Sequence, residues 1–206
     1  MSRILITGAN GGLGAHIVRA FQDRGDTVIT SSRSAGIVAD LTKAGDAQRV
    51  ADEAGGIDAL IHVTGGFAGG QPIHETDEAV WTQMLNLNLM AAVHMFKAVI
   101  PRMRQAGRGR IVAIGSRAGQ HPAATIAAYS ASKAALLSLV QTAALENKDA
   151  GITVNAILPA TMDTPNNTPD PRNVSAARIA EICVFLTTES AADITGAAIP
   201  VYGAQL

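Results

Sequence analysis

The sequence predicts an α/β fold, in which a doubly wound parallel sheet is flanked by helices. Short apolar runs alternate with longer segments of helical periodicity along the 206 residues, and this order is typical of βαβ units. Hydrophobic residues make up 48% of the chain but aromatic residues only 3%. The core must therefore consist of Ala, Val, Ile and Leu, as in a buried parallel sheet. Because no low-complexity stretch divides the sequence, we expect one domain over residues 1–206.

Seven apolar runs are expected to form the sheet. They are residues 3–7, 27–31, 37–39, 59–63, 110–115, 153–158 and 198–202. The segments with helical periodicity are residues 13–24, 43–54, 78–105, 127–149 and 176–188. Only residues 32–36 separate the second and third strands, whereas a parallel crossover normally needs about a dozen residues or more. We therefore expect the helix between these two strands to be missing.

Charge and cysteine content argue against several classes of function. The formal net charge of −1 provides no electrostatic case for binding nucleic acid or an acidic membrane surface. The single cysteine, Cys183, lies in an apolar run; it is expected to be buried filler and suits a reducing compartment. No secretory leader is apparent, and no uninterrupted apolar stretch approaches membrane-spanning length. We expect a cytoplasmic protein without nucleic-acid or membrane partners.

A glycine-rich turn follows the first predicted strand and leads directly into the first predicted helix. It reads Thr7-Gly8-Ala9-Asn10-Gly11-Gly12-Leu13-Gly14. Glycine lets the backbone turn tightly and approach a pyrophosphate, while the helix N-terminus supplies free N–H groups and a positive dipole end. A plain turn without a ligand is the alternative interpretation. The position between strand and helix favours a dinucleotide site in a Rossmann-like domain.

Three further residues indicate proton-transfer chemistry. Tyr129 and Lys133 stand four residues apart in a helical segment, so they share one helix face. A nearby ammonium would stabilise the phenolate and lower the pKa of the phenol from about 10 towards neutrality. Ser116 follows the strand predicted over residues 110–115, at the carboxyl edge where such sheets bind ligands. A solvated helix face and an ordinary turn serine are the alternatives.

Together these motifs resemble the short-chain dehydrogenase/reductase family. The turn matches the family's Thr-Gly-x3-Gly-x-Gly pattern at Thr7, Gly8, Gly12 and Gly14. Gly11 also permits the spacing of the family's longer branch, but the chain is too short for the additional substrate domain of that branch. The resemblance implies a nicotinamide-dependent oxidoreductase with a small-molecule substrate.

The resemblance also implies four catalytic positions. Tyr129 would donate a proton as hydride arrives from the nicotinamide, and Ser116 would polarise the reacting group. Lys133 would bind the nicotinamide ribose and tune Tyr129, and Asn88 would hold a water that links Lys133 to solvent. Asn86 lies only two residues from Asn88, which is about 200° around a helix, so both cannot face the site.

The positions that match the family's cofactor contacts favour NADP, with NAD as the alternative. Ser32 stands where NAD-preferring members carry aspartate, and Arg33 matches the arginine of NADP-preferring members. A solvated Arg33 is the alternative interpretation. Asp40 would contact adenine, and Thr164 the nicotinamide carboxamide. The implied contacts are Thr7, Gly8, Gly12, Leu13, Gly14, Ser32, Arg33, Asp40, Gly65, Lys133, Pro159 and Thr164.

Some departures from the family pattern concern the substrate. Residues 58–70 and 158–167 resemble dihydropteridine reductase, although that relative prefers NADH and lacks the catalytic serine. The substrate therefore stays open between a carbonyl or alcohol and a quinonoid, dihydropterin-like compound. Residues 165–175 form only a short polar loop, where related enzymes fold helices over the substrate, so we expect an open pocket. His62 is expected to be packed, and no histidines pair at metal-binding spacing, so we expect no metal site.

The sequence leaves open whether the protein is an enzyme and how it assembles. The alternative to an oxidoreductase is a regulatory or sensor protein that binds NADP without turnover. The helices predicted over residues 78–105 and 127–149 carry enough apolar residues for a second buried stripe, and family members pair through them. We expect a homodimer or homotetramer; a monomer with two well-buried helices is the alternative. The apolar residues of these two helices include Leu85, Leu89, Ala92, Val93, Phe96, Leu136, Leu139, Val140 and Ala143.

Overall fold

The computed structural model contains the predicted parallel sheet, and it describes residues 1–165, 167 and 169–204. The strands of this sheet are β1 (Arg3–Thr7), β2 (Thr27–Ser32), β3 (Ile37–Val38), β4 (Ala59–His62), β5 (Gly109–Ile114), β6 (Ile152–Pro159) and β9 (Ala198–Val201). They lie in the order β3-β2-β1-β4-β5-β6-β9, and all neighbours pair in parallel. The strand order reverses between β1 and β4, which is where sheets of this kind bind ligands.

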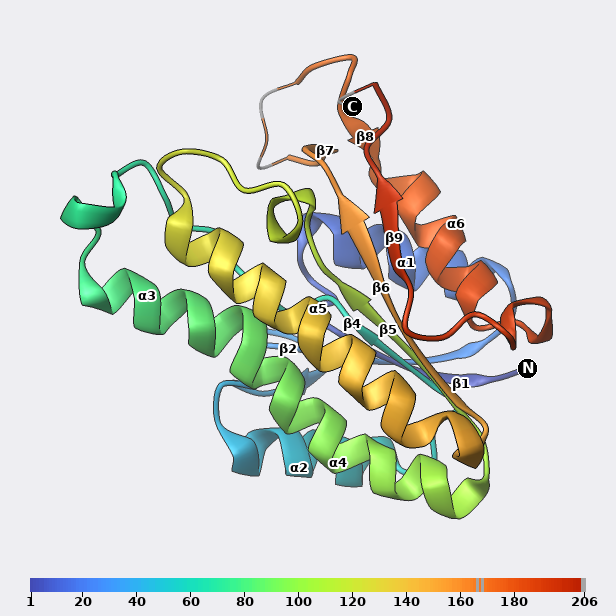
Figure 1. Ribbon diagram of the computed structural model, residues 1–206. Coiled ribbons are helices and arrows are strands. Elements are labelled where there is room, and N and C mark those ends of the chain that lie inside the picture. The colour runs from blue at the N-terminus through green and yellow to red at the C-terminus, as the bar shows by residue number, and fades with distance from the viewer. Residues whose placement is uncertain (166, 168, 205–206) are drawn as a thin grey trace.

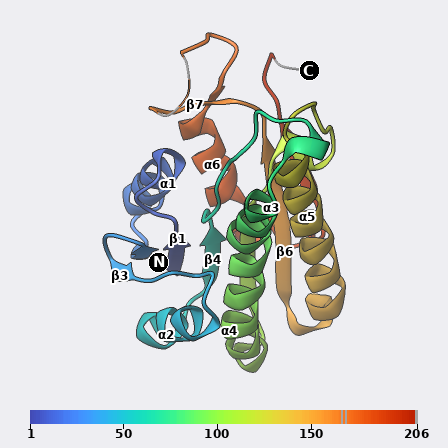
Figure 2. The ribbon, with the colours of Figure 1, turned by 90° about the vertical axis from the view of Figure 1, so that its left-hand side faces the viewer.

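Helices cover both faces of the sheet (Figures 1 and 2). One face carries α1 (Gly12–Asp23) and α6 (Ala176–Leu186), and the other carries α2 (Ala44–Ala54), α4 (Ala91–Ala106) and α5 (Ala127–Asn147). Successive residues of a strand point to opposite faces. Accordingly, Ile4 and Ile6 join the core cluster beneath α1 and α6, whereas Leu5 joins the cluster beneath the other three helices. The fold is the α/β class that the sequence predicts.

The remaining elements are short or extend the longer helices. They are α3 (Glu78–Leu85), the π-helical turn η2 (Asn86–Met90), the 3₁₀ turns η1 (Ile73–Glu75), η3 (Arg117–Gly119), η4 (Lys148–Ala150) and η5 (Glu189–Ala191), and the strands β7 (Met162–Asp163) and β8 (Val174–Ser175). β7 and β8 form a separate parallel pair; β7 precedes the segment 165–175 that was expected to be a plain loop, and β8 ends it. Two-residue strands are too short to produce a periodic signal in the sequence.

The connection between β2 and β3 contains no helix, as predicted. Residue 37 follows Ser32 after only a short turn, and Ser31 already pairs with Ile37. The hydroxyl of Ser32 accepts the Ala35 N–H at 2.9 Å and closes this turn. A short turn closed by a side-chain hydrogen bond therefore stands in place of the usual crossover helix. This turn lies at the ligand-binding edge of the sheet.

α3, η2 and α4 run on as one helix, Glu78–Ala106, as predicted over residues 78–105. By length and composition alone this helix could cross a membrane, but core helices of globular proteins share these properties, and 44% of its most apolar 18 residues are buried. Here the helix packs against α2, α5 and the sheet, because one stripe of its apolar side chains belongs to the core.

Candidate active site

The glycine turn forms a cradle at the carboxyl end of β1. A Cβ atom on Gly14 would lie 2.3 Å from the carbonyl oxygen of Gly8, so only glycine permits this close backbone turn. α1 begins without a side-chain cap and has no acidic residue in its first turn. Its first N–H groups are therefore available to an anion, which the positive end of the helix dipole also favours. These features fit the pyrophosphate of a dinucleotide.

Other predicted cofactor positions gather around this turn. The Thr164 Cβ lies 3.0 Å from where a Cβ on Gly12 would stand, so the segment after β6 lies directly over the turn. Pro159 ends β6, is buried and pairs with Val201. Leu13 is only 5% exposed and packs in the core, so this position can offer its N–H but not its side chain.

The residues expected on the adenosine side lie in two neighbouring turns. The Asn10 amide donates to the Ser34 hydroxyl at 3.2 Å, which holds the glycine turn against the turn after β2. Arg33 is exposed in that second turn. Asp40 accepts the Thr42 hydroxyl at 2.7 Å, and this hydrogen bond lowers the pKa of the Asp40 carboxyl. One Asp40 oxygen is thus committed to the local turn.

Ser116, Tyr129 and Lys133 meet where β5 and α5 come together. The Ser116 hydroxyl lies close enough to the Tyr129 phenol to influence its pKa, and it accepts the Ala118 N–H at 3.2 Å. Lys133 is 5% exposed, and its ammonium donates to the Ile114 carbonyl at 2.9 Å. The structure therefore brings together the three residues that the sequence singled out.

Asn88 joins this group through a π-helical turn. Its amide donates to the Gly66 carbonyl and to the Ser132 hydroxyl, each at 3.0 Å, and its Oδ1 accepts the Gly66 N–H at 2.9 Å. A Cβ on Gly65 would lie 2.8 Å from Asn88 Oδ1 and 3.4 Å from Lys133 Nζ. Asn88 is fully buried, whereas Asn86 is exposed. Of the two asparagines, Asn88 is the one that lies with Lys133, and its catalytic role stays a prediction.

The charge balance at Tyr129 differs from the sequence-based expectation. Burial raises the pKa of the Tyr129 phenol, and the influence of Ser116 offsets this only in part. Burial also lowers the pKa of the Lys133 ammonium to about 8. The expected lowering of the phenol pKa is wrong for this structure, because desolvation of the phenol itself is the largest influence on it. Tyr129 is consequently a protonated acid at neutral pH.

His62 is a packed residue, as expected. It is 1% exposed, and its Nδ1 is 3.0 Å from the Thr7 hydroxyl, which ties the end of β4 to the start of the glycine turn. Burial, assisted by the nearby Lys133 charge, lowers the pKa of the imidazole from 6.5 to about 3. Among the described residues, no three His, Cys, Asp or Glu side chains gather as a metal site.

This buried imidazole predicts an acid-dependent stability. As pH falls below 6.5, the unfolded chain binds a proton that folded His62 refuses down to about pH 3. Stability is therefore lost in that window, by up to about 1.4 kcal/mol per pH unit. In urea unfolding between pH 7 and roughly pH 5, His62→Asn should flatten the decline, whereas exposed His74→Asn should not. Equal slopes for the wild type and His62→Asn would contradict the assignment.

Two contacts were not predicted. Ser132 is fully buried between Asn88 and the Tyr129 backbone, to whose carbonyl its hydroxyl donates at 2.7 Å. Phe67, from the glycine-rich segment after β4, lies edge-to-face with Tyr129, with ring centroids 5.0 Å apart. The only sequence signal for the buried contact of Ser132 is the run of small and polar residues between Tyr129 and Lys133. No local signal indicated the Phe67 contact, because it joins distant segments.

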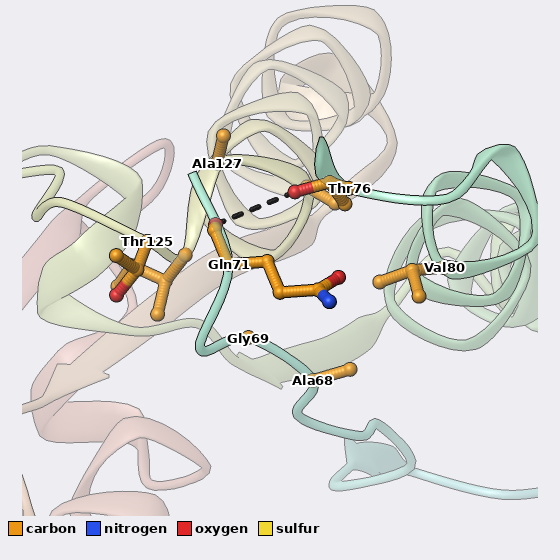
Figure 3. A pocket seen from close by; sticks show the side chains of 9 residues that line it. Ala68, Gly69, Gln71, Thr76, Val80, Thr125 and Ala127 are labelled. Atoms are coloured by element: carbon orange, nitrogen blue, oxygen red, sulfur yellow. Dashed lines mark hydrogen bonds between the residues drawn. The ribbon is translucent and has the colours of Figure 1, made fainter. Parts of the chain in front are cut away.

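A small pocket lies between this glycine-rich segment and the start of α5 (Figure 3). Its volume is about 60 Å³, well below the roughly 150 Å³ cavity that holds benzene. The Gln71 side chain extends across it towards Val80. The pocket is too small for a ring-sized substrate, and Tyr129, which is partly exposed, is not among the residues that line it.

Fold and site together define the class of this protein. A dinucleotide cradle and a neighbouring serine and tyrosine, backed by a buried lysine, lie at one edge of a doubly wound sheet. This is the arrangement of a nicotinamide-dependent oxidoreductase.

The chain belongs to the short-chain dehydrogenase family, whose profile matches residues 2–174. It is 31% identical to cis-4-hydroxycyclohexanecarboxylate dehydrogenase of Sinomonas cyclohexanicum and 31% identical to 2,5-dichloro-2,5-cyclohexadiene-1,4-diol dehydrogenase of Sphingobium indicum. Both alignments cover 97% of this chain and 94% of the relative. The alignments run over 234 and 235 positions, so these relatives contain segments that the 206 residues lack.

Solved structures show the same fold. A short-chain dehydrogenase/reductase family oxidoreductase from Burkholderia thailandensis is 30% identical, with a TM-score of 0.90 over 99% of this chain and 92% of its own. A 3-ketoacyl-(acyl-carrier-protein) reductase from Brucella melitensis, in complex with NADH, is 24% identical, with a TM-score of 0.92 over 100% and 98%. The protein is accordingly an enzyme of the dehydrogenase and reductase class.

Proposed function

We propose that the chain transfers hydride between NADP and a small carbonyl or alcohol substrate. A quinonoid, dihydropterin-like compound is the second candidate class, because of the sequence after β4. The observation that carries the proposal is the meeting of Ser116 and Tyr129 at one edge of the sheet, with Lys133 and Asn88 buried behind them. A serine–tyrosine pair at an open face can receive a carbonyl oxygen, and the buried residues hold the pair in place.

The mechanism assigns one task to each side chain. A bound nicotinamide supplies the hydride in the reducing direction. The Ser116 hydroxyl donates to the substrate oxygen and orients it, and the Tyr129 phenol gives that oxygen its proton. The raised pKa of Tyr129 keeps this proton in place at neutral pH. Lys133 supports the emerging phenolate with its charge, and the buried amide of Asn88 fixes the Gly66 backbone beside it.

The proposed substrate is a six-membered carbocyclic alcohol or its ketone. Two relatives at 31% identity are named for dehydrogenation of cyclohexane and cyclohexadiene alcohols. A ring ketone also suits the open face of Tyr129, since the neighbouring pocket is too small to enclose it. The test is NADPH oxidation with ring ketones, quinones and dihydropterins. Turnover of the ring ketones supports the proposal, and cofactor binding without turnover of any compound contradicts it.

NADP is proposed as the preferred cofactor because Arg33 is exposed beside the glycine turn and no carboxylate occupies the Ser32 position.

Arg33→Asp should shift the cofactor preference towards NADH. The substitution removes a partner for the 2′-phosphate and places a repulsive charge there; a charge-assisted hydrogen bond is worth roughly 1.5–3 kcal/mol, or at least about ten-fold in affinity. The measurement is the ratio of kcat/KM for the two cofactors, with Arg19→Asp on the exposed face of α1 as control. An unchanged ratio would show that Arg33 only faces solvent.

We further propose a cytoplasmic homodimer or homotetramer that pairs through the helix Glu78–Ala106 and α5. Many apolar residues of these helices, including Phe96 and Val140, belong to the core, but Leu85 is 37% exposed and Leu145, a further apolar residue of α5, is 72% exposed. Burying this remaining apolar surface would favour association. Light scattering at micromolar concentration should give a multiple of the 21.2 kDa chain mass; a monodisperse monomer contradicts the pairing.

A further inference from the structure

We propose that Phe67 determines substrate specificity by selecting ring-shaped substrates over open-chain ones of equal size. The inference rests on the proposed function, because it concerns what lies against Tyr129. The Phe67 ring meets the Tyr129 ring at an interplanar angle of 72° with 5.0 Å between centroids. It nevertheless leaves 67% of its surface exposed. An aromatic side chain is therefore presented to solvent directly beside the phenol that would transfer the proton.

The backbone on both sides of Phe67 is held in place. Before it, Gly66 makes two hydrogen bonds with the Asn88 amide group. After it, the Gly70 N–H donates to the Thr125 carbonyl at 2.8 Å. A Cβ on Gly69 would lie 2.6 Å from Ile126 Cγ2, so this segment lies directly on the start of α5. Thr125 itself is held at a φ of +64°, a strained value for a branched residue. The backbone that carries Phe67 is thus fixed on both sides by hydrogen bonds.

Packing in the core does not explain why an aromatic residue stands at position 67. Phe67 belongs to neither core cluster, and its ring contact is the edge-to-face pair with Tyr129. An exposed aromatic ring gains free energy when an apolar group covers it. The covering group must also reach the Tyr129 phenol, so the substrate itself is the natural occupant.

A rigid ring fits this position better than a chain. A cyclic ketone presents a flat apolar face to Phe67 while its carbonyl projects from the edge towards Ser116 and Tyr129. An open-chain ketone must freeze several torsions to cover the same surface, and that lost entropy weakens binding. Phe67 would therefore raise the affinity for cyclic substrates specifically.

The experiment compares cyclohexanone with hexan-3-one, which have equal numbers of carbon atoms and one carbonyl each. Binding to the NADP-loaded protein is measured by saturation-transfer NMR, and reduction by NADPH oxidation. Wild type should favour cyclohexanone by roughly ten-fold, and Phe67→Ala and Phe67→Leu should lose most of that preference. Phe67→Tyr should retain it. Ile73→Ala is the matched control, because Ile73 is 65% exposed in the same connection.

The outcomes separate this inference from the proposed function. A wild type without preference for the ring, or a preference unchanged in Phe67→Ala, overturns the role of Phe67. Ring-selective binding that depends on Phe67, but without reduction of either ketone, supports the role of Phe67 and contradicts the proposed carbonyl chemistry. Thermal unfolding of each variant checks that the fold is intact.

Discussion

Replacing Tyr129 with phenylalanine is expected to lower kcat by at least about 100-fold, the usual contribution of a positioned proton donor. The substitution removes the phenol oxygen beside Ser116 but keeps the ring that packs against Phe67. NADPH affinity should stay near the wild-type value, because the phenol oxygen is assigned to the substrate. The measurements are single-turnover rates with a reactive ketone and cofactor titration by fluorescence.

Tyr202→Phe is the matched control, since Tyr202 is a buried tyrosine outside the site whose hydroxyl donates to Gln120 at 3.3 Å. This variant should retain turnover. Activity of Tyr129→Phe within a few-fold of wild type would remove Tyr129 from the mechanism.

Replacing Lys133 with methionine is expected to cause the second-largest loss, again about 100-fold or more in kcat, and to weaken cofactor binding. The buried ammonium is proposed to support the Tyr129 phenolate and to bind the nicotinamide ribose. Because the pKa of Lys133 is lowered to about 8, the side chain is charged below that pH and neutral above it. Wild-type reduction should therefore slow as the pH rises through about 8.

Lys133→Arg tests the sign of this effect. Arginine keeps its charge throughout the accessible pH range, so residual activity should no longer fall near pH 8. Lys97→Met, which removes an exposed lysine from α4, should leave rate and pH profile unchanged. A wild-type profile that is flat above pH 8, or an unaltered limb in Lys133→Arg, would contradict the assignment.

The parts of the fold that the sequence predicted are those with strong local signals. Apolar runs, the glycine turn and the short link after Ser32 each constrain the backbone over a few residues, and all have their expected structure. Helical geometry showed that Asn86 and Asn88 cannot both face the site, and the family resemblance selected Asn88. The π turn that carries Asn88 and the β7–β8 pair were missed, since neither changes the hydrophobic pattern.

The features of the site that could not be predicted are tertiary. The partners of Phe67 and Ser132 come from other segments, and no spacing rule reports such contacts. The pKa of Tyr129 was expected to fall because the sequence shows the neighbouring lysine but not how deeply both groups are buried. In the structure, burial has the largest influence on the pKa of the phenol. This burial depends on β5, α5 and the Gly65–Gly70 segment together.

The most direct test of the central claim follows one hydrogen atom. NADPH carrying deuterium at the transferable position of its nicotinamide is mixed with cyclohexanone, and the product is analysed by mass spectrometry. We predict cyclohexanol with a single deuterium from the wild-type enzyme and almost none from Tyr129→Phe, although both proteins bind NADPH. Unlabelled or absent cyclohexanol from cofactor-saturated wild type, or equal label with Tyr129→Phe, would contradict the account.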